Sequence, residues 1–135
     1  MSNEAVSIST SKYITTIKAV IDGHTYTVRK IGAGEQLDLS REFSKLQELQ
    51  LEATNLHAKY EVAKTKEDKN KLEIEYINVA KPLADIMERI EDIYINLFDD
   101  GEDGKYSRQL VHSLSIGDVR KIYDEIMGAL DEKSA

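Results

Sequence analysis

Three histidines are the residues of this chain that are best suited by type to metal binding or acid–base chemistry. His24, His57 and His112 lie far apart in the sequence, and only His57 has a carboxylate, Glu61, one helical turn away. A zinc site needs three or four ligands, and the local sequence supplies two at most. We therefore expect the histidines to be solvated or to cap helices, and we predict no metal and no cofactor.

The acidic segment 99–104 (Asp-Asp-Gly-Glu-Asp-Gly) invites comparison with a calcium loop. An EF-hand loop that began at Asp99 would place Gly101 third and Leu110 twelfth, where oxygen ligands are required. The segment is therefore predicted to be a solvated turn. The glycines of segment 32–34 lack the Lys-Ser/Thr that completes a phosphate-binding loop, so this segment is expected to be a joint.

No sequence context marks a catalytic serine, so we predict that the chain is not an enzyme. The chain has 135 residues, 41% hydrophobic and 32% charged, and a formal net charge of −7. This charge disfavours a nucleic-acid partner. Cysteine is absent, the first residues are polar, and no apolar run reaches membrane-spanning length. We expect one soluble, intracellular domain with no membrane partner.

Residues 13–31 are predicted to form a β-hairpin, preceded by a flexible arm over residues 1–12. Asp22-Gly23 is a two-residue turn that tolerates positive φ, and it sets Ile21 opposite His24. One face of the hairpin is then apolar and must be covered by helices or by another subunit, while both edges are open to a further strand. The candidate self-association residues on this face are Ile17, Ala19, Ile21, Tyr26 and Val28.

Residues 35–98 are predicted to form two long helices. The first begins near Asp38 or Ser40, and its apolar stripe stops at the polar segment 64–71. The stripe resumes with a shifted phase, and Thr65 followed by Asp68 can cap a new helix. An antiparallel helical hairpin is therefore favoured over one continuous helix. The second helix is expected to kink at Pro82 and to end near Phe98.

The second helix carries more apolar surface than one neighbouring helix needs. Its main stripe repeats at gaps of four and three, the period of a buried helical seam. This stripe is the candidate partner-binding surface: Leu72, Tyr76, Val79, Leu83, Ile86, Ile90, Ile93 and Leu97. A second apolar row runs beside it: Ile74, Ile77, Ala80, Ala84, Met87, Tyr94 and Phe98. The excess either lies under the hairpin and the final helix or forms a groove for a partner helix.

Residues 105–131 are predicted to hold the C-terminal helices: a short one around 107–113 and a final one capped by Ser115. Asp118 completes the cap, and one face is apolar at Val119, Ile122, Tyr123, Ile126 and Leu130. Residues 131–135 are expected to fray. The predicted class is thus mainly α with a small N-terminal β-hairpin (α+β), a long antiparallel helical hairpin and short C-terminal helices.

This order of elements resembles the tail assembly chaperones of long-tailed bacteriophages. The resemblance rests on the hairpin segment 17–28, on Gly34-Glu35-Gln36-Leu37 at the entry to the helices, on the long charged helices, and on the closing segment 115–119. It implies a chaperone that coats the helical tape measure protein, helps to recruit tail tube subunits, and self-associates into an oligomer or filament. It also implies a location in the host-cell cytoplasm during virion assembly and absence from the mature virion. The family has no fixed motif from which residue roles could be transferred.

Two other functions stay open at this point. A structural minor tail or head–tail completion protein would use the same hairpin and helices for permanent ring contacts. A coiled-coil regulator is disfavoured, because the most basic stretch, 59–71, is interleaved with carboxylates.

Overall fold

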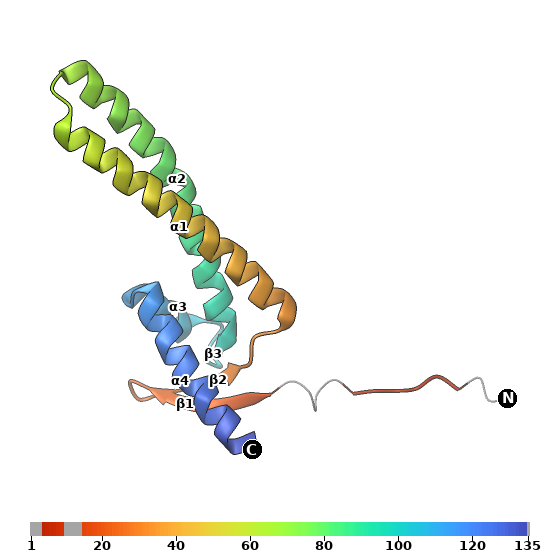
Figure 1. Cartoon of the computed structure of the whole chain (residues 1–135). Coiled ribbons are helices and arrows are strands. Elements are labelled where there is room, and N and C mark those ends of the chain that lie inside the picture. The colour runs from red at the N-terminus through yellow and green to blue at the C-terminus, as the bar shows by residue number, and fades with distance from the viewer. Residues whose placement is uncertain (1–3, 10–14, 135) are drawn as a thin grey trace. The chain divides into compact units, whose positions relative to one another are not determined.

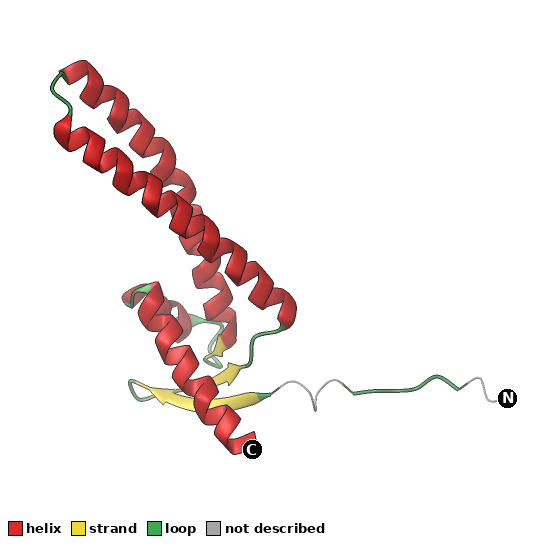
Figure 2. Cartoon of the chain, viewed as in Figure 1, coloured by secondary structure: helices red, strands yellow, loops and turns green. Residues whose placement is uncertain are grey.

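The computed structural model describes residues 4–9 and 15–134, with the order β1, β2, α1, α2, β3, α3, α4 (Figures 1 and 2). The predicted class, mainly helical with a small N-terminal hairpin, is confirmed. Where the sequence analysis expects one domain, the chain forms two compact units. The segments up to Ile31 and from Ile95 make one, and Gly32–Tyr94 makes the other.

Only part of the predicted arm is described. Residues 4–9 have neither helix nor strand, whereas 1–3 and 10–12 lie outside the described residues, as does Tyr13, the predicted start of the hairpin. Over the ranges that are described, no helix has both the length and the apolar character needed to cross a membrane.

β1 (Thr16–Ile21) and β2 (His24–Arg29) form the predicted hairpin. Asp22 has φ 51° and Gly23 has φ 81°, so both turn residues are left-handed, as the right-handed twist of paired strands requires. The predicted register is confirmed. Its facing pairs on the apolar side are Ile21 with His24, Ala19 with Tyr26, and Ile17 with Val28.

A third strand, β3 (Phe98–Asp99), corrects the prediction that both hairpin edges are open. It pairs with β2, which becomes the central strand, and leaves β1 at the edge of the sheet. Phe98 is 1% exposed and contacts the rings of Tyr26 and Tyr123 edge-on. Burial of this ring draws the chain into the sheet directly after the preceding helix, which ends at Leu97.

α3 (Lys105–Ser113) and α4 (Ile116–Ser134) complete the first unit, in which α4 packs on β1. The predicted cap is confirmed, because Ser115 Oγ accepts the Asp118 N–H at 3.1 Å. α4 continues over 131–134, where fraying was predicted. The Tyr123 hydroxyl donates to the Arg29 carbonyl at 2.9 Å and accepts the Ile31 N–H at 2.8 Å, so α4 holds the exit from β2.

The second unit holds the predicted helical hairpin, formed by α1 (Ala33–Val62) and by α2 (Lys66–Leu97) up to Tyr94. α1 begins five residues before Asp38, because the backbone around Gly32 serves as its N-cap: Glu35 Oε1 accepts the Gly32 N–H at 3.3 Å. The predicted restart is confirmed, since Thr65 Oγ1 accepts the Asp68 N–H at 3.1 Å. α2 continues through Pro82, and the kink expected there stays a prediction.

The two helices of this unit pack antiparallel through an apolar seam. Glu42 Oε2 accepts the Arg89 Nε–H at 3.1 Å near one end, and Leu56 lines a cavity with Leu72 and Tyr76 near the other. As residue numbers increase along α1, the residue numbers of their neighbours on α2 therefore decrease, as they do between antiparallel helices. The buried seam residues of Gly32–Tyr94 that belong to the two stripes are Leu39, Leu46, Leu56, Val79, Ile86 and Ile90.

Candidate partner-binding surfaces

The predicted partner-binding stripe lies mostly inside the chain. Four of its members are buried, namely Val79, Ile86, Ile90 and Leu97, with exposed fractions of 0–7%. Leu72, Leu83 and Ile93 are half-buried, and only Tyr76 is exposed. The apolar face of α1 covers the stripe within the second unit, so most of this surface is used for folding and is closed to a partner.

The second apolar row of α2 provides the exposed surface. Ile74 is 61% exposed and Ile77 is 48% exposed, whereas Tyr94 and Phe98 of the same row are buried. At about 100° of rotation per residue, Ile74 lies on the side of α2 opposite the seam, and Ile77 lies next to Ile74 on that outer side. We call Ile74 and Ile77 the outer pair. It is apolar surface that the second unit does not bury.

A shallow groove opens between the helices near the same part of α2. It is a cavity of about 170 Å³, and we call it the hairpin groove. Tyr60 and Tyr76 are both partly exposed in it, above an apolar floor, and the Lys69 ammonium lies 5.5 Å from the Tyr60 ring. An aliphatic side chain with a polar flank fits such a site. The lining residues are Leu56, His57, Tyr60, Leu72, Glu73 and Tyr76.

The predicted self-association residues fall into two groups. Tyr26 and Val28 on the central strand are 4% and 0% exposed, and they belong to the core of the first unit. Ile17, Ala19 and Ile21 on the edge strand are half-buried. Any surface for self-association on this face of the sheet is therefore confined to β1.

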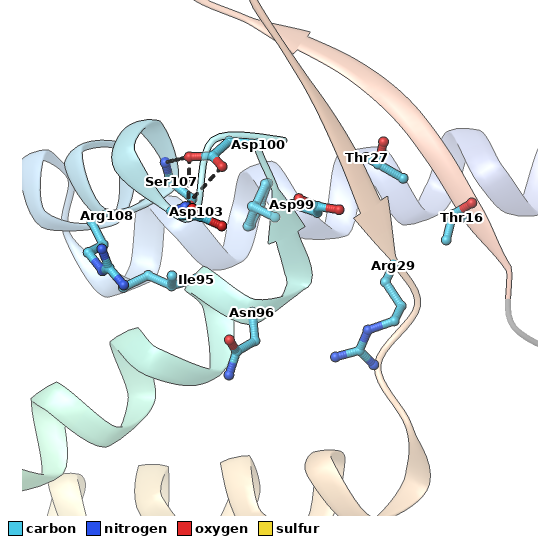
Figure 3. A pocket seen from close by; sticks show the side chains of 12 residues that line it. Thr16, Thr27, Arg29, Ile95, Asn96, Asp99, Asp100, Asp103, Ser107 and Arg108 are labelled. Atoms are coloured by element: carbon cyan, nitrogen blue, oxygen red, sulfur yellow. Dashed lines mark hydrogen bonds between the residues drawn. The ribbon is translucent and has the colours of Figure 1, made fainter.

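Asp100 corrects the prediction of a solvated acidic turn. Its carboxylate is buried and turned toward the start of α3 (Figure 3). Oδ1 accepts the N–H groups of Glu102 and Gly104 at 2.8 and 3.0 Å. Oδ2 accepts those of Tyr106 and Ser107 at 2.7 and 3.0 Å. One side chain thus shapes the loop and caps the helix.

The pKa of Asp100 reflects two opposing effects. Desolvation by burial acts to raise it, but the four backbone N–H donors outweigh burial and hold the pKa well below its usual range. Burial also raises the pKa of Tyr26, and the negative charge of Asp100 adds to that rise. Asp100 is therefore a permanent anion at neutral pH, and its role is structural.

A polar cavity of about 400 Å³ adjoins this loop (Figure 3). Arg29 of β2 and Arg108 of α3 line it together with Asp99 and Asp103. Ser107 also lines it and is 1% exposed, and its hydroxyl donates to Asp100 Oδ2 at 3.5 Å. Among residues 4–9 and 15–134, no cluster of three or more His, Asp or Glu side chains could hold a metal ion.

His24 differs from the solvated histidine that was expected. It is half-buried, its Nε2 lies 3.0 Å from the Asp100 carbonyl, and its ring stacks on Tyr106 at 3.9 Å between centroids. His57 is exposed and pairs with Glu61 at 3.5 Å, as the spacing predicts. His24 and Asp100 are 76 residues apart, and no local pattern signals that they meet.

No protein-family model matches this chain, and neither the curated proteins nor the solved structures include one with significant similarity to it.

Proposed function

We propose that the chain is a non-enzymatic phage tail assembly chaperone, which holds helical segments of the tape measure protein on its helical hairpin and helps to bring tail tube subunits to them. The partner identities come from the resemblance of element order described above. The binding mode comes from the exposed apolar surface of α2.

The observation that carries the proposal is the exposure of Ile74, Tyr76 and Ile77 within one stretch of α2. An isolated helical hairpin would be expected to place polar residues there, as it does at the neighbouring Glu73, Glu75 and Asn78. The outer pair, Ile74 and Ile77, lies three residues apart on one side of α2 and fits the apolar face of a client helix, whose contacts recur every three or four residues. Tyr76 lies on the other side of α2, in the hairpin groove, and offers a separate contact.

The expected affinity of one such site is low, and this suits a chaperone that must leave. Full burial of an aliphatic side chain contributes about 1.5–3 kcal/mol, part of which association costs offset. A long client with many similar segments would bind many copies, so avidity replaces tight single contacts. The net charge of −7 helps to keep such a coated complex dispersed.

Co-expression with the tape measure protein of the same genome tests the proposal. The wild-type chain should increase the soluble fraction of the tape measure protein, and the double variant Ile74→Gln/Ile77→Gln should lose most of this effect. The matched control is Leu37→Gln/Leu51→Gln, which changes two exposed leucines of α1 that are 52% and 64% exposed. A tape measure protein that is no more soluble with the wild-type chain would refute the chaperone proposal.

Mass spectrometry of purified particles separates a chaperone from a structural virion component. A chaperone should be absent or scarce in the particles, whereas a minor tail or head–tail completion protein should be present in fixed stoichiometry. Stoichiometric incorporation would therefore overturn the proposal in favour of the structural alternative.

A further inference from the structure

The edge strand β1 offers backbone groups to a further strand. Within the described sheet β1 pairs on one side only, with β2. Because Ile21 and His24 flank the two-residue turn, Ile21, Ala19 and Ile17 direct their N–H and C=O groups toward β2. The alternate residues Thr16, Lys18 and Val20 then direct theirs toward the open edge.

Burial across the sheet also points to this edge. The apolar residues of β2, Tyr26 and Val28, are 4% and 0% exposed, but their neighbours on β1 are only half-buried. Burial is thus complete on β2 and only partial on β1, although α4 packs on β1. A further strand with two apolar residues on this face would extend the cover.

The described part of the N-terminal arm has the pattern of such a strand. Residues 4–9 read Glu-Ala-Val-Ser-Ile-Ser, so that Val6 and Ile8 point to one side of an extended segment and Ser7 and Ser9 to the other. Val6 is 86% exposed and Ile8 is 65% exposed. Six residues also match the length of β1, Thr16–Ile21.

We propose that residues 4–9 of one chain add as a strand to the β1 edge of a second copy, with Val6 and Ile8 on the side of Ile17, Ala19 and Ile21. This inference goes beyond the proposed function, because it needs no client. A second copy is favoured over the same chain because residues 4–9 form no strand in the single chain, whose described sheet has the order β1-β2-β3. A parallel pairing of the arm with its own β1 would also need a crossover of about a dozen residues.

The geometry makes the association heterologous. Each chain gives one arm and receives one, so contacts repeat from copy to copy and need not close. One short strand buries less area than a standard interface, and the association should be correspondingly concentration-dependent.

The first experiment measures the mass of the purified chain by light scattering over a range of concentrations. The wild type should exceed the 15.3 kDa of one chain by a growing factor as concentration rises. Val6→Lys/Ile8→Lys should stay at one chain, whereas the matched control Ser7→Lys/Ser9→Lys, which adds the same charge to the other side of the arm, should retain most of the association. A wild type that stays at one chain, as in an arm folded onto its own β1, would overturn the proposal.

A complementation experiment tests the pairing of arm and edge directly. One chain lacks residues 1–9 and keeps the edge. The other carries Val20→Pro, which blocks an N–H that faces the edge and leaves the β1–β2 ladder intact. Each alone should be a monomer, and the mixture should form a 1:1 complex that grows no further. Oligomers of the truncated chain, or a mixture that stays monomeric when both chains show native circular dichroism, would refute arm exchange. Neither outcome depends on the tape measure protein.

Discussion

Asp100 shows how a single buried charge can organise a loop. Transfer of a carboxylate out of water is costly unless hydrogen bonds replace its hydration, and here four backbone N–H groups do so. The loop reaches this geometry through left-handed residues, with φ 53° at Asp103 and 85° at Gly104. The same carboxylate accepts the N–H groups of the first turn of α3, and its negative charge there interacts favourably with the positive end of the helix dipole.

Asp100→Asn should therefore destabilise the protein by about 2 kcal/mol, because an amide keeps one acceptor oxygen and replaces the other with a donor that faces N–H groups. Urea unfolding monitored by circular dichroism measures the change. Glu102→Gln is the matched control, since it alters an exposed carboxylate of the same loop and should change stability by less than about 0.5 kcal/mol. Equal effects of the two substitutions would contradict the assigned role of Asp100.

The lowered pKa of Asp100 also predicts a dependence on pH. The unfolded chain takes up this proton at about pH 4, the folded chain only at a lower pH, so protonation favours unfolding. The stabilisation should be complete above about pH 5 and decline as the pH falls further. The difference in urea midpoint between wild type and Asp100→Asn should shrink over that range. A constant difference down to the acid limit would show that the charge is not what stabilises the loop.

At the scale of the element, α2 presents the same residue type in two environments. Ile86 is 3% exposed in the seam, and Ile74 is 61% exposed on the outer side. Ile86→Ala should cost about 2–5 kcal/mol through lost burial and a residual cavity, whereas Ile74→Ala should stay within about 0.5 kcal/mol. Thermal and urea unfolding measure both. A large loss from Ile74→Ala would mean that the outer pair is already packed within the fold.

Pro82 is the second feature of α2 with a measurable consequence. It supplies no N–H to the turn that precedes it, and its ring crowds the carbonyl of Asn78. Pro82→Ala should raise stability by about 1–3 kcal/mol and relieve the expected kink. Lys81→Ala is the neighbouring exposed control and should be close to neutral. If Pro82→Ala destabilises the protein instead, the bend is required for packing beside Leu49 and Ile86, with which Pro82 lines a groove.

Features encoded by neighbouring residues could be predicted from the sequence. The hairpin register follows from Asp22-Gly23, and the caps at Thr65 and Ser115 follow from a hydroxyl three residues before a carboxylate. The two long helices and the apolar face of the last helix follow from periodicity. These patterns involve residues close together in the sequence, so they can be recognised without knowledge of the rest of the fold.

Features that depend on distant contacts could not be predicted in this way. β3 exists because Phe98 reaches Tyr26 and Tyr123, and Asp100 caps α3 across a loop whose composition suggests solvent. The periodicity of α2 identifies two apolar rows, but only the packing of α1 decides which row is covered. For the same reason the main stripe, which was predicted to bind a partner, lies largely in the core, and the exposed residues Ile74 and Ile77 belong to the second apolar row.

For the molecule as a whole, the net charge of −7 governs how copies meet. Like charge opposes association, whereas an arm docked on an edge strand gains apolar contacts and backbone hydrogen bonds. Added salt shortens the Debye length to about 8–10 Å near physiological ionic strength, so it should strengthen self-association. Light scattering at low and moderate salt measures this, with the chain lacking residues 1–9 as the unresponsive control. Dissociation by salt would indicate that ion pairs drive the contact instead.

The first unit is assembled from the two ends of the chain, and this has a consequence for its biosynthesis. The hairpin leaves the ribosome long before the helix that covers it. Ile31 donates its N–H to Tyr123, which is synthesised 92 residues later. At roughly 5–20 residues per second, the nascent hairpin spends about 5–20 s without its covering helix, and a shorter time without its third strand. Throughout that interval Tyr26 and Val28 face solvent on a translating polysome, where neighbouring nascent chains carry the same uncovered hairpin.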